Sequence, residues 1–330
     1  MKHTIKTFFT LALALALFGM TACKGPSDNN SDGTDEGVRS WTAELTLSSD
    51  TLGIKVTVTT DDGTPVTVEG CTETELKSGI ETDLNANGTT VKLTGKITEL
   101  SCGSNKLTGL NVQGGVNALT TLRCNDNKLA ALNVHGCTAL TGLSCDGNKQ
   151  LTSLNVQGCT ALTNLSCQNN GLSSLDVHGC TALGSLRCDE NKQLTSLNVE
   201  GCTALSWLGC AGSKLETLNV EGCTALSMLS CAKNKLTSLN VQGCTSLGFL
   251  DCYGNKLDAA AFTKILNALP VYAGGQCTLY TEQTGVTEGN CKDFTSATAP
   301  ADLKAAFSKA KTEKKWTMKK YNGSGDSVEI

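Results

Sequence analysis

The stretch LTTLRCNDNKLAALNVHGCTA, from Leu119 to Ala139, decides the architecture because it is one of seven nearly identical copies between Leu119 and Val271. Successive copies are 21 or 22 residues apart, and a degenerate first copy places Cys102 another 22 residues upstream. The cysteines that mark the copies are Cys124, Cys145, Cys167, Cys188, Cys210, Cys231 and Cys252. A fixed period of this length indicates equal structural units that each contact only their neighbours.

Each copy contains two similar halves. Leu140 to Asn148 follows L-x-x-L-x-C-x-x-N, and Leu151 to Cys159 follows L-x-x-L-N-V-x-G-C. With a period in the twenties, this pattern predicts a leucine-rich-repeat solenoid of parallel β coils with little helix. Strand alternation should turn Leu and Cys or Val inward. Stacked strands lie about 4.8 Å apart, so eight coils should form a body of roughly 35–40 Å.

Two further ladders of equivalent residues should occupy the corners of the coils. An inward Asn amide can hydrogen-bond to turn backbone that would otherwise be buried without a partner. Ser213 is the single departure from the asparagine series. The asparagine series is Asn105, Asn127, Asn148, Asn170, Asn191, Asn234 and Asn255, and the cysteine series is Cys137, Cys159, Cys180, Cys202, Cys223 and Cys244.

The chain has 18 cysteines, but none of the ladder cysteines forms a C-x-x-C pair. Zinc sites usually need such local pairs, so we expect no metal site and no cofactor. In-register strands hold neighbouring Cβ atoms about 4.8 Å apart, beyond the usual disulfide separation of about 3.8 Å. Free cysteine behaves as a small buried hydrophobe, so the pattern favours packing thiols, although sequence alone leaves disulfides open.

The N-terminus carries export signals. Lys2 and Lys6 precede the short apolar run FFTLALALALFG, which predicts a secretory signal peptide over residues 1–22. The stretch Met20 to Cys23 resembles a bacterial lipobox, so Cys23 should be the lipidated N-terminus of the mature protein. Residues 23–40 then form an acidic, flexible tether. The alternative is a plain secreted protein with an incidental cysteine.

The remaining chain divides into three parts. Residues 41–98 alternate apolar and polar positions around Asp62-Gly63, which suggests a hairpin within an N-terminal β cap. Residues 99–257 are the repeats. Residues 258–330 should form a C-terminal α/β cap, with helices in LDAAAFTKILNALP and PADLKAAFSKAKTEK and strands in QCTLYTE and KWTMKKY. An oxidising compartment would permit a disulfide between Cys277 and Cys291.

Charge limits the kinds of partner. Without the signal peptide, the chain has 25 basic and 31 acidic residues, which gives a net charge of −6. This does not favour nucleic acid or an anionic membrane surface as a partner. There is no second long apolar run, so we expect contact with the membrane only through the lipid anchor.

Function in a repeat protein should lie where the repeats differ and face solvent. The outward positions of the first-half strands are small or polar in the early coils, but Trp207, Met228 and Phe249 share one column in the last three. Asp251 and Tyr253 lie alongside. Such side chains anchor protein interfaces, so these five residues are the predicted ligand-binding site. The alternative is that the C-terminal cap folds back and buries them as core.

The stretches LTSLNVQGCTAL, VTVEGCTETELKSGI and EGNCKDF resemble those of treponemal-type leucine-rich-repeat surface lipoproteins. The resemblance covers most of residues 60–330. It implies an outer-membrane or cell-surface location and a role in attachment to host cells or to other bacteria. It carries no shared ligand motif.

Two functions follow as expectations. The first is a monomeric surface adhesion module whose partner is a protein of the host matrix, the epithelial surface or another bacterium. The second is a scaffold lipoprotein that faces the periplasm and organises envelope partners. An enzyme is not expected, because no histidine lies in a nucleophile or metal motif and no glycine-rich phosphate loop occurs.

Overall fold

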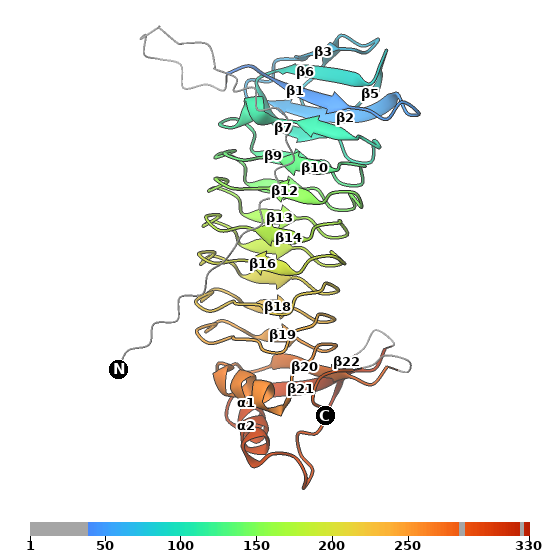
Figure 1. Ribbon diagram of the computed structural model, residues 1–330. Coiled ribbons are helices and arrows are strands. Elements are labelled where there is room, and N and C mark those ends of the chain that lie inside the picture. The colour runs from blue at the N-terminus through green and yellow to red at the C-terminus, as the bar shows by residue number, and fades with distance from the viewer. Residues whose placement is uncertain (1–38, 284–287, 324–326) are drawn as a thin grey trace, which may run out of the picture. The chain divides into compact units, whose positions relative to one another are not determined.

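The computed structural model describes residues 39–283, 288–323 and 327–330. The expected signal peptide 1–22, the lipidation site Cys23 and the tether up to residue 38 lie outside the described residues. The described chain forms one elongated stack of coils between two caps (Figure 1). The expected leucine-rich-repeat solenoid with an N-terminal β cap and a C-terminal α/β cap is thus confirmed.

The N-terminal cap consists of antiparallel strands in two layers. One layer is a five-stranded sheet in the order β4-β3-β6-β1-β8, whereas β2 and β5 belong to the long sheet of the solenoid. β7 joins cap and coils, because it pairs antiparallel with β2 and parallel with β9. The bounds are β1 (Trp41–Thr46), β2 (Gly53–Thr60), β3 (Val66–Glu69), β4 (Glu75–Leu76), β5 (Thr82–Asn85), β6 (Thr90–Gly95) and β7 (Ile97–Ser101).

The hairpin expected around Asp62-Gly63 is wrong. β2 pairs with β5 and β7, while β3 pairs with β4 and β6, so the turn carries the chain from one sheet to the other. Both strands bury a valine face, for example Val58 and Val68. Alternation determines which face of a strand is buried, but not which strand becomes its partner.

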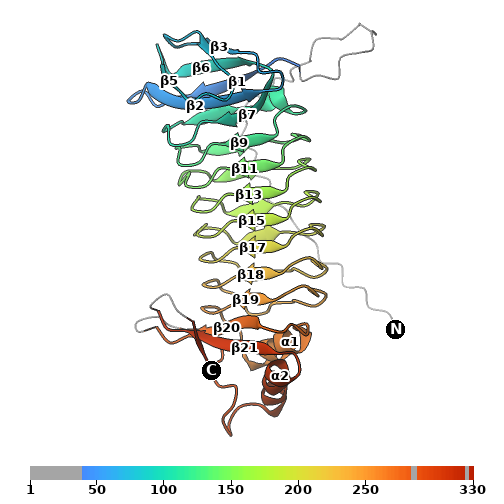
Figure 2. The same cartoon turned by 180° about the vertical axis from the view of Figure 1, so that it is seen from behind.

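The first-half strands of the coils form one continuous side, which we call the first side. They pair parallel and in register, so that Leu143 lies between Leu122 and Leu165 (Figure 2). With both caps they build a 13-stranded sheet. The coil strands after β7 are β9 (Thr121–Arg123), β11 (Gly142–Ser144), β13 (Asn164–Ser166), β15 (Ser185–Arg187), β17 (Trp207–Gly209), β18 (Met228–Ser230) and β19 (Phe249–Asp251).

The second-half strands form the opposite side, here called the second side, and its pairing is interrupted. β10 pairs with β12, β14 pairs with β16, and Asn219 forms an isolated bridge with Asn240. β8 pairs instead with β1 of the N-terminal cap. The bounds are β8 (Gly109–Asn111), β10 (Ala131–Asn133), β12 (Ser153–Asn155), β14 (Ser174–Asp176) and β16 (Ser196–Asn198).

The core runs the length of the stack. The inward Leu and Cys of the first side and the inward Val of the second side are almost fully buried, as at Leu122, Cys124 and Val134. Burial of one such aliphatic side chain contributes about 1.5–3 kcal/mol relative to exposure. Repetition of the same inward residues in every coil therefore stabilises the whole stack.

The asparagine corner forms the expected hydrogen bonds. Asn148 Nδ2 donates to the carbonyl oxygens of Cys124 at 3.0 Å and Cys145 at 2.9 Å, and its Oδ1 accepts from Leu129 N at 3.1 Å. The ladder extends into both caps. Asn105 bonds to the backbone of Lys55, and Asn290 accepts from Leu257 N at 2.8 Å.

Two coils contain an extra residue, and there the ladder changes. In Asn148–Leu151 and Asn191–Leu194, the leucine N–H donates to the asparagine carbonyl of its own coil. The asparagine of the next coil therefore loses a donor. Asn170 Oδ1 is buried without a partner in the described chain, and after the second such coil the ladder position is Ser213. The serine thus stands where an Asn oxygen would also lack a donor.

The cysteines are free thiols. All 17 of them in the described residues are unpaired, and all but Cys291 are buried. The disulfide suggested between Cys277 and Cys291 is absent, and Cys277 lies within hydrogen-bond reach of Cys252 instead. Burial raises the pKa of the ladder thiols, to about 11 for Cys137 and about 12 for Cys159. These groups therefore pack as neutral hydrophobes.

The C-terminal cap continues the first side and replaces the second. β20 (Gly275–Thr281) pairs parallel with β19, β21 (Trp316–Tyr321) with β20, and β22 (Ser327–Glu329) closes the sheet antiparallel. Helix α1 (Ala259–Ala268) begins at Asp258, which accepts from Ala261 N at 2.7 Å, and α2 (Ala301–Thr312) packs against it. Buried Lys314 donates to Leu269 O at 2.6 Å near the end of α1, where the helix dipole favours a cation.

Candidate binding surface

The first side changes character along the stack. At the first outward position of each strand, Thr121, Gly142, Asn164 and Ser185 are followed by Trp207, Met228 and Phe249. The register pairs these last three residues directly, so they form one column across β17, β18 and β19. We call Trp207, Met228 and Phe249 the apolar column. Directly paired positions on neighbouring strands bring their side chains into contact range.

Trp207 lies across its own strand. The side chain of Arg187, from the preceding coil, stacks over the indole with Cζ 4.6 Å from the ring centroid. A Cβ atom at Gly209 would approach the ring edge to 2.9 Å, so the indole covers this glycine. The space above Gly209 is therefore occupied by the indole of Trp207. A cation–π contact of this kind contributes about 0.5–1 kcal/mol at a partly exposed site.

The cap does not bury the column. Met228 is 43% exposed, and Trp207 and Phe249 are half-buried. β20 continues the sheet, with Gln276 paired to Phe249, so the cap strands lie beside the column rather than over it (Figure 2). Exposed apolar side chains that are contiguous on one face are unusual on a water-facing surface.

The structure adds two residues that the repeat pattern did not reveal. The ring of Tyr272 lies against Gly248, the residue before Phe249, and is 44% exposed. Its neighbour Val271 is 74% exposed. Both belong to the loop between α1 and β20, outside the repeats, so no comparison of equivalent coil positions could find them. The ring of Tyr272 thus adjoins the start of β19, beside the apolar column.

Asp251 is the last residue of β19 and Tyr253 lies just beyond it, both next to the C-terminal cap. Tyr253 stacks on Tyr321 with ring centroids 4.7 Å apart, and its partial burial raises the pKa of the phenol to about 12. Lys233 Nζ lies 6.0 Å from the Tyr253 ring centroid. Asp251 Oδ1 is buried without a hydrogen bond in the described chain, and burial raises the pKa of this carboxyl above its ordinary value. These two residues thus border the column rather than continue it.

A metal site and a membrane span each require a particular arrangement of residues. The described residues hold no group of three or more His, Cys, Asp or Glu side chains placed to bind a metal ion. In the same residues no helix has the length and apolarity needed to span a membrane. The fold is a repeat scaffold that presents an extended surface.

No protein-family model and no curated protein matches the chain. Among solved structures it is similar to the functional domain of InlJ from Listeria monocytogenes, described as including a cysteine ladder, with 26% identity and a TM-score of 0.36. The match covers 58% of this chain and 51% of that one. This chain therefore spans about half the length of the InlJ domain.

Two further structures show a similar likeness. The leucine-rich-repeat protein LIC12759 of Leptospira interrogans is 19% identical, with 50% of this chain and 57% of that chain covered and a TM-score of 0.29. The internalin InlF of Listeria monocytogenes is 15% identical, with 62% and 84% covered and a TM-score of 0.29. The chain is a leucine-rich-repeat protein that resembles these bacterial proteins. A treponemal-type lipoprotein identity stays a prediction.

Proposed function

We propose that the protein is a cell-surface adhesion module that binds a protein partner through the last three coils of the first side. The partner would be a protein of the host matrix, the epithelial surface or another bacterium. The proposal rests on the apolar column, which is exposed or half-buried even though the C-terminal cap lies next to it. Its side chains are of the kinds that dominate the binding energy of protein interfaces.

The form of the surface supports this function. A continuous parallel sheet holds Trp207, Met228 and Phe249 in fixed register, so little conformational entropy is lost when they are buried by a partner. Arg187 adds a charged group that already stacks on Trp207, and Tyr272 with Val271 widens the apolar area. The earlier coils present small and polar residues and would form the periphery of the contact.

We further propose that the protein is located at the outer membrane, on the cell surface. Acylation of Cys23 would anchor the chain to the outer membrane, and the acidic tether would hold the solenoid away from the lipid. Stable anchoring requires more than one acyl chain, as bacterial lipobox processing supplies. A periplasm-facing scaffold lipoprotein is the alternative. Protease treatment of intact cells separates the two, since only a surface-exposed chain would be cleaved.

Binding to extracellular-matrix proteins and to epithelial cells tests the function. The variant Trp207→Ser/Phe249→Ser should bind at least about tenfold more weakly than the unmodified protein, since such side chains carry most of an interface energy. Asn164→Ser, at the equivalent position of a polar coil, is the matched control and should bind normally. Circular dichroism should show all three proteins folded. Unchanged binding by the double variant would exclude the apolar column as the contact site.

A further inference from the structure

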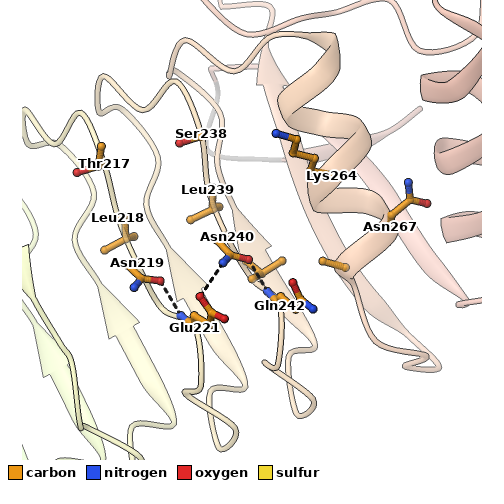
Figure 3. A pocket seen from close by; sticks show the side chains of 12 residues that line it. Thr217, Leu218, Asn219, Glu221, Ser238, Leu239, Asn240, Gln242, Lys264 and Asn267 are labelled. Carbon is orange, nitrogen blue, oxygen red and sulfur yellow. Dashed lines mark hydrogen bonds between the residues drawn. The ribbon is translucent and has the colours of Figure 1, made fainter. Parts of the chain in front are cut away.

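A second candidate site lies on the second side, where the repeats end. An open groove of about 1010 Å³ separates helix α1 from the last two coils (Figure 3). Its floor includes Leu218, Leu239 and Ala268, and polar side chains surround it. The polar lining residues are Thr217, Asn219, Glu221, Ser238, Asn240, Gln242, Lys264 and Asn267.

The groove follows from a mismatch of dimensions. Successive coil strands lie about 4.8 Å apart, whereas a helix packs with its axis about 10 Å from its neighbour because of its larger diameter. On the first side β20 takes the next strand position, but on the second side α1 stands where a strand would be. The helix leaves the outer backbone edge of Thr237–Gly243 unpaired within the described residues, and the groove opens between this edge and α1.

The edge of this last coil carries the same backbone groups that join β10 to β12 and, in part, β14 to β16; between the other coils of the described chain the equivalent groups are not bonded in this way. Between β10 and β12, Thr152 N donates to Ala130 O at 3.0 Å, Val134 N donates to Asn155 O at 3.0 Å, and Gly136 N donates to Gln157 O at 2.8 Å. The equivalent groups in the last coil are Thr237 O, Val241 N and Gly243 N. In the described chain none of these three bonds to another coil or to α1.

The side chain of Gln242, on the same edge, also lacks among the described residues the partner that equivalent glutamines have in earlier coils. Gln113 Nε2 donates to Asn133 O in the next coil at 2.8 Å, and Gln157 Nε2 donates to Asp176 O at 3.4 Å. Gln242 occupies the equivalent position in the last coil, where no further coil follows. Its backbone is fixed because its N–H donates to Asn240 Oδ1 at 3.0 Å (Figure 3). Its side-chain amide faces the groove and can donate to a main-chain carbonyl there.

We propose that this groove binds an extended peptide segment of another protein, which adds to the solenoid as the missing strand. The segment would run parallel to Thr237–Gly243, accept hydrogen bonds from Val241 N, Gly243 N and Gln242, and donate one to Thr237 O. Addition of a strand to an exposed edge is a recurrent mode of peptide recognition, in which the main chain supplies affinity and side-chain pockets supply selectivity.

The charged side chains at the two ends of the groove determine which peptide sequences should bind best. Lys264 lies at the end near Ser238, and Glu221 lies at the opposite end, where Asn240 Nδ2 donates to it at 3.1 Å (Figure 3). Both side chains are exposed. A parallel segment would therefore carry an acidic residue near its N-terminal end and a basic residue near its C-terminal end, with small apolar residues between them over Leu239.

Selection of linear ten-residue peptides from a random phage-displayed library on the purified protein tests this proposal. Bound peptides should show the acidic-to-basic order. Ala268→Trp, which fills the groove from α1, should weaken their binding by about tenfold or more, and Lys264→Glu by a smaller factor. Ala260→Trp, at an exposed position of α1 outside the groove, is the matched control. N-methylation of alternate peptide amides should abolish binding, because it removes the strand hydrogen bonds.

Several outcomes would overturn the proposal. They are the absence of any peptide that prefers the unmodified protein over Ala268→Trp, binding that tolerates N-methylation at every amide, and self-association of the protein that Ala268→Trp abolishes. The last result would assign the groove to a second copy of this chain. The Trp207→Ser/Phe249→Ser variant should retain peptide binding, since the apolar column is on the opposite side. Peptide binding in the groove can therefore be tested even if the apolar column turns out not to bind a partner.

Discussion

The two corners of each coil face the same physical problem and solve it with different atoms. At the asparagine corner one side chain satisfies several backbone groups, with Asn148 making bonds of 2.9–3.1 Å to Cys145 O, Cys124 O and Leu129 N. At the cysteine corner a thiol donates once, as Cys159 Sγ does to Val134 O at 3.1 Å. Sulfur is a weak donor, so this second corner depends mainly on packing.

This difference indicates that the fold requires the corner asparagines, whereas the corner cysteines can be replaced in part. An amide has the donors and the acceptor needed at the first corner in one planar group, and the other side chains of that size do not. A buried thiol supplies volume and one weak bond, which other small apolar side chains can partly replace. The asparagine corner should therefore be sensitive to substitution, whereas the cysteine corner should be sensitive to conditions that ionise a thiol.

The largest expected effect is alkaline unfolding. Burial raises the pKa of the ladder thiols, so above the ordinary thiol pKa of about 9 the unfolded chain loses protons that the folded chain keeps. Stability is then unaffected by the thiols below that pH and falls as the pH rises toward the folded pKa of about 11–12. Each fully buried thiol can contribute up to about 1.4 kcal/mol of loss per pH unit.

The measurement is the free energy of urea unfolding between pH 7 and pH 10 under reducing conditions. Because many thiols act together, the free energy should drop steeply above pH 9 while it stays nearly constant between pH 7 and pH 8. A profile that is flat up to pH 10 would show that the thiols of the folded protein ionise as readily as those of the unfolded chain. Methylation of the thiols in the unfolded state, followed by refolding, is not a suitable control, since it changes the packed volume.

A smaller effect separates two asparagines of the same ladder. Asn148→Ala leaves Cys124 O, Cys145 O and Leu129 N without this partner and should cost about 3–5 kcal/mol of unfolding free energy. Asn170→Ala should cost about 1–2 kcal/mol less, because Asn170 Oδ1 already has no partner in the described chain. Urea denaturation of both variants measures the difference. Equal losses would contradict the role assigned to the extra residue in the preceding coil.

The smallest effect concerns the one serine of the ladder. Ser213→Asn should change the unfolding free energy by no more than about 1 kcal/mol in either direction, since the new amide could donate to Cys188 O and Cys210 O but its oxygen would lack a donor. Leu194 N, the donor expected by equivalence, already bonds to Asn191 O at 2.8 Å. The same denaturation experiment measures it. A gain well above this range would mean that the serine is a defect rather than an adaptation.

Much of the fold could be predicted from the sequence because the same information is repeated in every coil. The inward Leu and Cys, the asparagine corner and the parallel stacking all follow from one copy, and both helices of the C-terminal cap followed from local spacing. The hairpin at Asp62-Gly63 was predicted wrongly, because alternation carries no information about strand partners. β22 was not predicted, since three exposed or half-buried residues give no pattern.

The candidate site was predictable only in part, for a related reason. Comparison of equivalent coil positions found Trp207, Met228 and Phe249, because a repeat reveals whatever departs from it. Tyr272 and Val271 lie in a loop of the cap, which has no equivalent position to compare with. The groove beside α1 depends on the difference in width between a helix and a strand, a property of three-dimensional packing that no single residue encodes.

The closed ends of the long sheet determine how such a protein can change in length. Antiparallel strands terminate both ends, β5 on β2 and β22 on β21, so neither end presents the parallel edge that another coil would need. Duplication of one 21- or 22-residue unit between the caps, by contrast, leaves both ends intact and lengthens the body by about 4.8 Å. Gain or loss of whole repeat units by mutation can therefore change the length of the solenoid in equal steps while both caps stay the same.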